Sequence, residues 1–281
     1  MRGPIPRFAG ALSILLGCAA SESPTDGGGG QSTTTSFDDG EGGGGDDCPD
    51  VGDDILLLTA DRRLVSFDPT VDGPAAYQPL SQLDCAASGA PASMAIARSG
   101  VAYVLYSNGR IYQVDAKTGA CTSTDYDVGG FAYQGMGMTA TEPNGTAEAF
   151  YTTTPGVGLA RVLLPSFQVS QLGGGTDLRA ELTGGIDGRL FLLDETGALS
   201  EIDRGTLGQT FVHRFEQWSA QSAIAVARHT GIFYGFAGTT PANAVTFRYD
   251  PEADEETVRD QGLGFVVVGA GQSTCAPPPV K

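Results

Sequence analysis

The stretch Ile111-Tyr112-Gln113-Val114-Asp115-Ala116-Lys117-Thr118-Gly119 is the clearest indication of the fold in this chain. Residues 111–115 form a short, largely apolar run of the kind that strands contain. Asp115 can accept hydrogen bonds from backbone N–H groups two residues further on, and Gly119 permits a tight turn. We therefore expect a strand followed by an Asp-led turn, in which Asp115 has a structural and not a catalytic role.

The same strand and turn occur at four further places, roughly 40 to 50 residues apart. Short apolar runs separated by Gly, Asn, Asp and Pro lie between these copies, and this pattern is typical of many short strands. The repeat therefore predicts units of four antiparallel strands. The copies lie at 64–69, 160–165, 199–204 and 246–251, with Asp68, Asp203 and Asp250 in the place of Asp115 and Pro165 in the second copy. Glycine-containing pairs suited to hairpin turns lie at 99–100, 144–145, 187–188 and 230–231.

The two ends of the repeat region complement each other. Residues 55–80 supply a second, third and fourth strand with no first strand before them. The C-terminal region supplies a single first strand, Gly264-Phe265-Val266-Val267-Val268-Gly269. Pairing Phe265 to Val268 with Ile55 to Thr59 would complete a unit and remove the open sheet edges. We therefore expect an all-β, five-bladed β-propeller closed by a C-terminal strand, and six blades with one degenerate are the alternative. The expected blades are 263–270 with 55–82, then 93–126, 134–173, 180–215 and 221–260.

This organisation resembles that of β-propellers, and the turn Asp115-Ala116-Lys117-Thr118-Gly119 is similar to that of quinoprotein-type and NHL-like repeats. The resemblance extends over most of 55–270 and implies a ring of blades around a central axis. We expect Gly135-Met136-Gly137-Met138 to let a first strand approach the crowded axis. A cofactor role for these glycines is disfavoured, because no helix follows to present its N-terminus.

The N-terminus is typical of an export signal. Two arginines precede the apolar run 8–16, which is too short to cross a bilayer. Cys18 directly follows Leu15-Leu16-Gly17, an arrangement that resembles the lipobox of bacterial lipoproteins. The resemblance implies that the signal peptide 1–17 is removed and that Cys18 is acylated, with palmitate among the chains, so that lipid anchors the protein to a membrane. An ordinary secretory signal cleaved nearby is the alternative.

The segment after the cysteine is expected to be a linker. By the same resemblance, Ala19 favours the outer membrane of the bacterial cell envelope. Residues 18–50 contain glycine runs, a Ser/Thr run and many acidic residues, a composition that predicts a flexible chain. No later segment reaches the roughly 18 consecutive apolar residues that a transmembrane helix needs. We therefore expect three parts: the signal peptide 1–17, the lipidated linker 18–50 and the propeller 51–281.

The charge balance narrows the choice of partners. The chain has 33 acidic and 16 basic residues and a formal net charge of −17 at pH 7. Such a negative field disfavours nucleic acid and anionic surfaces. We expect no nucleic-acid partner, and we expect a monomer that contacts the membrane through its lipid.

Four cysteines besides Cys18 allow three pairings. Cys48 and Cys275 bracket the proposed propeller, so a bridge between them would lock the ring. Cys85 and Cys121 lie near the outer strands of adjacent blades. We predict these two disulfides. Metal binding by these cysteines is disfavoured, because no Cys-x2-Cys spacing occurs and neither histidine is near a cysteine in sequence.

The chain contains few residues suited to catalysis. His213 and His229 are its two histidines, which leaves little for a catalytic triad, a histidine-based metal site or histidine acid–base chemistry. The Gly-x-Ser-x-Gly and P-loop motifs are absent. We expect no cofactor and no metal.

Propeller geometry places a ligand site over the axis, among the loops that enter the first strands and the turns between second and third strands. Trp218 is the strongest candidate, because an aromatic face with nearby amides suits sugars or peptides. The alternative is that Trp218 packs between blades, since large aromatic residues are usually buried. The candidate ligand-binding residues are Asp127, Tyr133, Gln134, Arg179, Trp218 and Gln221.

Two classes of function fit these observations. The first is a membrane-tethered, non-catalytic binding or scaffold protein that recognises a protein or glycan through a propeller face. The second is a secreted glycoside hydrolase or lyase, which would need two channel carboxylates at a defined separation. Asp127, Asp177, Glu181 and Glu216 could supply such a pair. We favour binding, because most acidic residues fall in turns or at solvent-facing strand positions.

Overall fold

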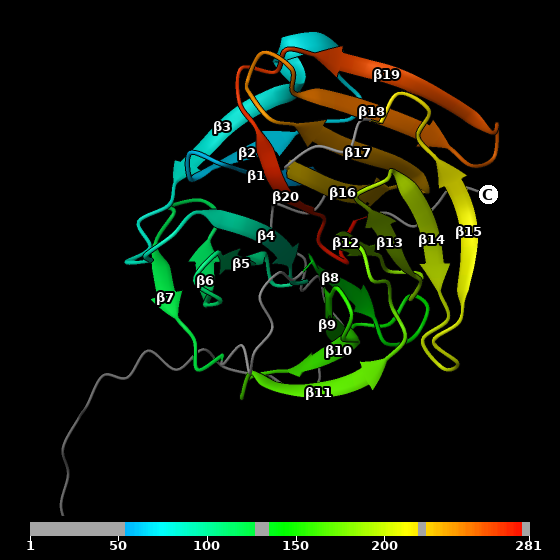
Figure 1. Ribbon diagram of the computed structural model, residues 1–281. Helices are drawn as coiled ribbons and strands as arrows, with labels where there is room; N and C mark the ends of the chain where they lie inside the picture. The colour runs from blue at the N-terminus through cyan, green and yellow to red at the C-terminus, as the bar shows by residue number, and fades with distance from the viewer. Residues whose placement is uncertain (1–53, 127–134, 219–222, 277–281) are drawn as a thin grey trace, which may run out of the picture. The chain divides into compact units, whose positions relative to one another are not determined.

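Five four-stranded antiparallel sheets form the described part of the chain, arranged as the blades of a β-propeller (Figure 1). The computed structural model describes residues 54–126, 135–218 and 223–276. One short 3-10 helix, Gly73–Ala76, interrupts the otherwise all-β structure of this part of the chain. The prediction of an all-β, five-bladed propeller closed by a C-terminal strand is confirmed.

The five blades follow one another in chain order, and the strands of each run from the axis to the outside of the ring. Blade 1 contains β20 (Val267–Gly271), β1 (Ile55–Thr59), β2 (Arg63–Phe67) and β3 (Tyr77–Gln82). Blade 2 contains β4 (Pro91–Ile96), β5 (Val101–Tyr106), β6 (Ile111–Asp115) and β7 (Cys121–Ser123). Blade 3 contains β8 (Gly135–Ala140), β9 (Glu148–Thr154), β10 (Gly158–Leu163) and β11 (Gln168–Gly173). Blade 4 contains β12 (Ala180–Gly184), β13 (Leu190–Asp194), β14 (Ala198–Ile202) and β15 (Gln209–Arg214), and blade 5 contains β16 (Ala223–His229), β17 (Ile232–Gly238), β18 (Val245–Asp250) and β19 (Glu255–Gln261).

Blade 1 closes the ring by joining the C-terminal strand β20 to β1. Leu57 pairs with Ala270 and Leu58 with Gly269, with a register shift between Leu58 and Thr59. The closing strand was expected to begin at Gly264, and this boundary is wrong because β20 starts at Val267. The Phe265 ring instead lies 5.8 Å from the Tyr77 ring, against the cluster of buried residues between blades 1 and 5.

The innermost strands meet at the axis and need small residues there. β4, β8, β12, β16 and β20 contact one another around the ring. A Cβ atom on Gly135 or Gly137 would collide with Ala180 and Leu182 of β12, and one on Gly269 would lie 2.7 Å from the backbone nitrogen of Met94. The glycines of β8 therefore permit the close approach that the sequence predicted.

Five hydrophobic clusters of buried residues fill the spaces between neighbouring blades. Phe67 of blade 1 packs edge-on against Phe236 of blade 5, with ring centroids 5.7 Å apart. Tyr103 of blade 2 lies 5.1 Å from Phe150 of blade 3. Burial of these aromatic rings holds the blades together, since each large side chain removes considerable apolar area from water.

The repeated aspartates have the structural role that their turns predicted. Asp115 Oδ1 accepts the backbone N–H groups of Lys117 and Thr118, both at 2.9 Å. Asp203 Oδ1 accepts those of Gly205 and Thr206, both at 2.8 Å. Because the N–H groups favour the ionised carboxylate, Thr118 lowers the pKa of Asp115 and Thr206 lowers that of Asp203.

The Cys85–Cys121 disulfide is present and joins the segment after β3 to the outermost strand of blade 2. Cys275 is also disulfide-bonded. Its expected partner Cys48, like Cys18 and the whole of 1–53, lies outside the described residues, so that pairing and the lipid anchor stay predictions. In the part of the chain that the structure describes, no helix is long and apolar enough to cross a membrane.

Candidate functional site

A buried carboxyl group lies at the axis of the ring. Glu181 of β12 accepts a hydrogen bond of 2.7 Å from the hydroxyl of Ser93 on β4. The Ser93 oxygen in turn accepts the backbone N–H of Met136 on β8, at 3.1 Å. Glu181 and Ser93 are both buried. This network therefore ties blades 2, 3 and 4 together at their innermost strands.

Burial raises the pKa of Glu181. Loss of solvent raises its pKa well above the ordinary value, and the hydrogen bonds from Ser93 and Met136 and the positive charge of Arg179 offset only part of this shift. A raised pKa in a glutamate is a property of some general acids. A glycosidase also needs a second carboxylate nearby.

The structure does not bring such a carboxylate pair together in the described part of the chain. Asp177 and Glu216, two of the acids that could have joined Glu181, are exposed. Asp127, the third, lies outside the described residues. The nearby charge that acts on Glu181 is the guanidinium of Arg179. The axial glutamate is therefore part of a hydrogen-bond network that connects blades.

Of the predicted ligand-binding residues, Arg179 and Trp218 belong to the described part of the chain. Both lie at the end of the ring where loops enter the innermost strands. Arg179 forms a 2.9 Å ion pair with Glu195. The Trp218 indole N–H donates to the backbone oxygen of Glu195 at 3.3 Å, so the same residue contacts both. The remaining candidates, Asp127, Tyr133, Gln134 and Gln221, lie outside the described residues.

Trp218 is packed inside the protein. Only 9 % of its surface is exposed, and its ring lies 5.6 Å from Phe215 and 5.4 Å from Phe247. A Cβ atom on Gly197 would lie 2.6 Å from the indole. This arrangement matches the alternative expectation, in which Trp218 packs between blades, and leaves little indole surface for a ligand.

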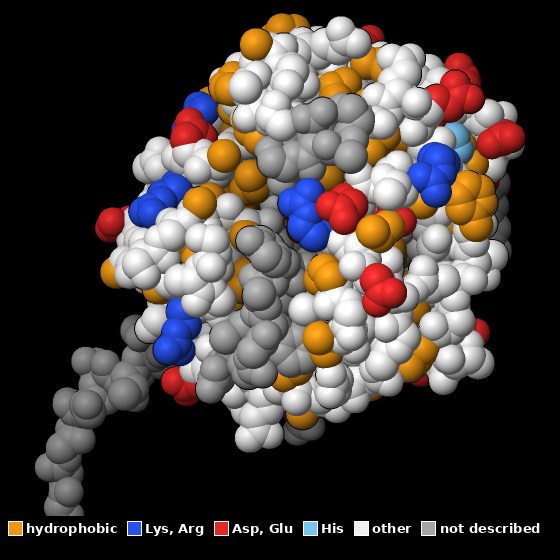
Figure 2. Space-filling view, in the orientation of Figure 1, with side chains coloured by type: hydrophobic (Ala, Val, Ile, Leu, Met, Phe, Trp, Pro, Cys, Tyr) orange, Lys and Arg blue, Asp and Glu red, His pale blue; other side chains and the backbone are white. Residues whose placement is uncertain are grey.

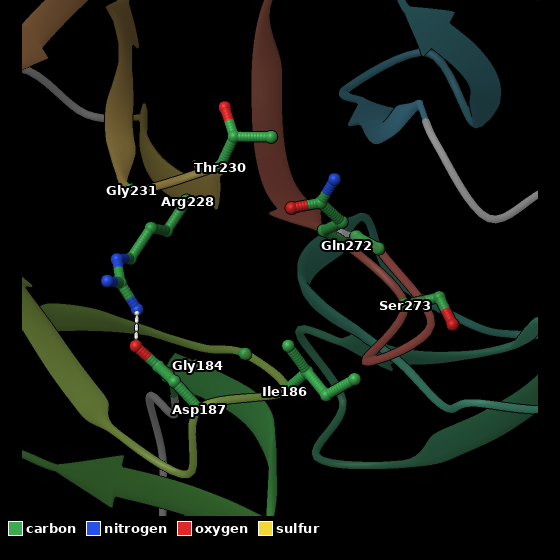
Figure 3. Close-up of a pocket in the computed structure, with 10 residues that line it drawn as sticks. Gly184, Ile186, Asp187, Arg228, Thr230, Gly231, Gln272 and Ser273 are labelled. Carbon is green, nitrogen blue, oxygen red and sulfur yellow. Dashed lines mark hydrogen bonds and ion pairs between the residues drawn. The ribbon is translucent and has the colours of Figure 1, made fainter. Parts of the chain in front are cut away.

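A pocket of about 270 Å³, including its open mouth, lies at the opposite end of the ring (Figure 3). Three segments that are distant in sequence form it: residues 184–187 between β12 and β13, residues 228–231 between β16 and β17, and residues 272–276 after β20. The pocket thus joins blades 4 and 5 to the C-terminal segment that follows blade 1.

Arg228 provides the positive charge of this pocket. Its side chain is 7 % exposed, and Nη1 donates to Asp187 Oδ2 at 2.6 Å, as Figure 3 shows. The guanidinium carbon lies 4.9 Å from the ring centre of Phe191 and 5.6 Å from that of Phe233. These contacts hold the guanidinium in place by charge pairing and cation–π attraction.

The C-terminal segment 272–276 crosses this end of the ring. Gln272 Nε2 lies 2.5 Å from His229 Nδ1 of blade 5, and the Thr274 hydroxyl donates to Glu148 Oε1 of blade 3 at 2.7 Å. Glu148 also accepts the backbone N–H of Arg98 from blade 2 at 2.8 Å. Burial raises the pKa of Glu148. The segment therefore ties three blades to the closing strand.

Sequence reasoning did not identify this end of the ring as a site. The available signal was the pair Arg228-His229, which ends an innermost strand otherwise made of Ala, Ile and Val. A charged residue at the end of such a strand is costly unless it is paired. The partners, Asp187 and Gln272, come from distant parts of the chain and could not be assigned from the sequence.

The surface around the axis is mixed in character. On the face drawn in Figure 2, basic and acidic side chains are interspersed, and apolar side chains appear in small separate areas. Among the large apolar residues of the described ranges, Phe211 on the outermost strand of blade 4 is the most exposed, at 63 %. Apolar residues exposed singly are ordinary for a soluble surface and do not indicate a site.

Fold and site together define a five-bladed β-propeller with a small polar pocket at one end of its ring. No family model matches the chain, and no curated protein matches it. Among solved structures, it is similar to a structural genomics protein of unknown function from Bacteroides thetaiotaomicron VPI-5482, with 13% identity and a TM-score of 0.46, covering 74% of this chain and 58% of that one. It is also similar to TolB from Acinetobacter baumannii, with 14% identity and a TM-score of 0.45, covering 74% of this chain and 52% of that one. The chain thus spans between half and three-fifths of the length of these proteins, and the likeness concerns the fold alone.

Proposed function

We propose that this protein is a lipid-anchored binding or scaffold protein of the bacterial cell envelope, which recognises a protein or glycan through an end of its propeller ring and catalyses no reaction. The proposal rests on the hydrogen bonds and the surroundings of Glu181 at the axis. Glu181 is occupied by Ser93 and Met136 and has no second carboxylate among the described residues around it. Buried ionisable groups that are hydrogen-bonded to neighbouring strands also occur in purely structural networks.

The closed ring favours recognition for a physical reason. Each blade contributes turns to both ends of the ring, so residues far apart in sequence are presented side by side on rigid strands. Sites built on such elements lose little conformational freedom on binding. The pocket at residues 184–187, 228–231 and 272–276 is one such convergence.

The anchoring part of the proposal rests on the sequence around Cys18. Several acyl chains on one residue give stable membrane attachment, since each buried CH₂ contributes about 0.8 kcal/mol. The Gly- and Asp-rich linker up to residue 50 would then hold the propeller at a distance from the membrane surface.

Metabolic labelling with an alkyne palmitate tests the anchor. We expect the full chain expressed in a bacterium to incorporate the label and to partition into the detergent phase, and we expect the Cys18→Ser variant to do neither. Ser21→Ala, three residues away in the same segment, is the matched control and should behave as the unmodified sequence does. A full chain that carries no label would exclude the lipid anchor.

A glycan array combined with a turnover assay tests the choice between binding and catalysis. We expect the full chain to retain glycans or envelope proteins without releasing reducing sugar or unsaturated products. Glu181→Gln should leave retention unchanged, because the amide can keep the hydrogen bond from Ser93. Release of product that disappears in Glu181→Gln would instead establish the hydrolase or lyase.

A further inference from the structure

The outermost strand of blade 3 is an open sheet edge. In the described part of the chain, the sheet of this blade ends at β11, which Figure 1 shows at the outside of the ring. The strand Gln168–Gly173 contains no charged residue and no proline. An edge of this kind leaves a row of backbone N–H and C=O groups with which another strand can pair.

The other four outermost strands are protected against such pairing. β3 contains Pro79, which has no N–H group, and β7 has three residues and is held by the Cys121 disulfide. β15 ends in His213 and Arg214, and four of the seven residues of β19 are charged. A register shift in the ladder between β10 and β11 does not set β11 apart, because β3, β15 and β19 have such shifts as well. β11 is therefore the least protected outer edge among the described strands.

Exposed apolar side chains are concentrated on the outer part of the same blade. Of the seven large apolar residues that are exposed in the described ranges, four belong to β10, β11 and the turns on either side of β10: Val157, Leu163, Leu164 and Leu172. Leu172 lies on β11 itself, and 39 % of its surface is exposed. This concentration on one blade distinguishes these residues from apolar residues that are exposed singly.

The sequence of β11 is complementary to itself in the antiparallel direction. A two-fold axis between Ser170 and Gln171 places Val169 of one copy opposite Leu172 of the other, and Ser170 opposite Gln171. An apolar residue then faces an apolar one and a polar residue faces a polar one, and matched cross-strand pairs of this kind stabilise a sheet. Such an interface is isologous, because both copies contribute the same edge.

We propose that β11 pairs with β11 of a second copy of this chain, so that two propellers form a dimer. Charge favours this edge: a formal net charge of −17 makes two copies repel each other, and β11 adds no acidic group to the contact. The charged residue of the neighbouring strand β10 is the basic Arg161, opposite Ser170. Two strands of this length form a small interface, of the size typical of weak and transient complexes. A dimer replaces the monomer expected from the sequence, and its surface lies at the outside of the ring and not at its ends.

Sedimentation equilibrium of the purified full chain tests the dimer, with Cys18→Ser present throughout so that lipid does not drive association. We expect a monomer–dimer equilibrium between about 1 µM and about 1 mM protein, with more dimer as the concentration rises. Raising the ionic strength from about 0.01 M to about 1 M should favour the dimer, because salt screens the repulsion between two acidic copies. A monomer at every concentration, or a dimer that dissociates as salt is added, would overturn the proposal.

Two variants locate the contact. Gln171→Glu should weaken dimerisation about tenfold or more, because two carboxylates without partners meet near the two-fold axis. Thr122→Glu, at an exposed position of the outermost strand β7, is the matched control and should leave the dimer unchanged. Equal weakening by both variants would show that overall charge and not this edge controls association, and would refute the proposal.

Hydrogen exchange of the same protein identifies what covers the edge. We expect the backbone amides of residues 168–173 to become more protected as the protein concentration rises, and to lose this gain in Gln171→Glu. Protection that is the same at every concentration would show that a segment of the same chain covers β11, and would refute the dimer. Amides that stay unprotected although dimers form would place the dimer contact on another surface, with the same consequence.

Discussion

The acids at the outer turns and the acid at the axis show how one functional group takes opposite roles in two regions of the same ring. Asp115, at an exposed outer turn, accepts two backbone N–H groups, which lower its pKa. Glu181, at the axis, is buried, and the loss of solvent raises its pKa. The outer turns are therefore shaped by local hydrogen bonds, whereas the axis is shaped by crowding and burial.

Substitutions that add atoms at the crowded axis should have the largest effect on the stability of the protein. Gly135→Val should destabilise the protein by about 4 kcal/mol or more, because the added carbons collide with the backbone of Ala180 in the next blade. Gly205→Val, in an outer turn, is the control and should cost below about 1 kcal/mol. Urea unfolding of both variants measures the difference. Equal costs would show that the axis is no tighter than the outer turns.

The disulfide at the outside of blade 2 predicts the next effect. Replacing Cys85 and Cys121 together by alanine should cost about 3 kcal/mol, since the bridge closes a 36-residue separation and restricts the unfolded chain. The Ser123→Ala variant on the same strand should change little. Thermal unfolding under non-reducing conditions checks this. A loss below about 1 kcal/mol would mean that the outer strands are held by their sheet bonds alone.

The axial glutamate predicts a smaller effect with a characteristic pH dependence. Because its pKa is raised in the folded state, folding favours the protonated form, and stability decreases as pH rises above the ordinary value of 4.5. Glu181→Gln should remove this decrease and be more stable than the unmodified protein near neutral pH. Denaturant midpoints at about pH 5 and about pH 8 measure the change. A variant that is less stable at both pH values would mean that the charged carboxylate stabilises the axis.

The outer aspartates predict the smallest effect and the opposite pH dependence. Asp115→Ala should cost about 1 kcal/mol, because the N–H groups of Lys117 and Thr118 lose their shared acceptor. Since the pKa of Asp115 is lowered in the folded state, its stabilisation is present above the ordinary value of 3.8 and lost as pH falls through the folded-state pKa. Asp203→Ala should show a pH dependence of the same sign, because the N–H groups of Thr206 and Gly205 lower the pKa of Asp203. If Asp115→Ala cost more stability at low pH than at neutral pH in urea unfolding, the result would contradict this prediction.

These two regions also differ in how far the sequence alone describes them. The outer turns were predictable down to single hydrogen bonds, because an aspartate and the N–H groups that it accepts are only two or three residues apart. The repeat of these turns predicted five blades, with six as the alternative, and the complementary ends of the repeat region predicted the closing strand. The start of β20 was misplaced, since the sequence does not show that Phe265 packs against Tyr77 while Gly269 meets the axis.

The amino-acid sequence was sufficient to predict the four-stranded repeat and the glycines that the axis requires, because the strand, turn and glycine signals lie in residues that are close neighbours in the chain. The proposed export signal and lipid anchor rest on the sequence around Cys18. The contact of Glu181 with Ser93, the burial of Trp218 and the meeting of Arg228, Asp187 and Gln272 in one pocket could not be predicted from the sequence. Those contacts join different blades. Their geometry follows from how closely the innermost strands approach the axis, which depends on the packing of all five sheets at once.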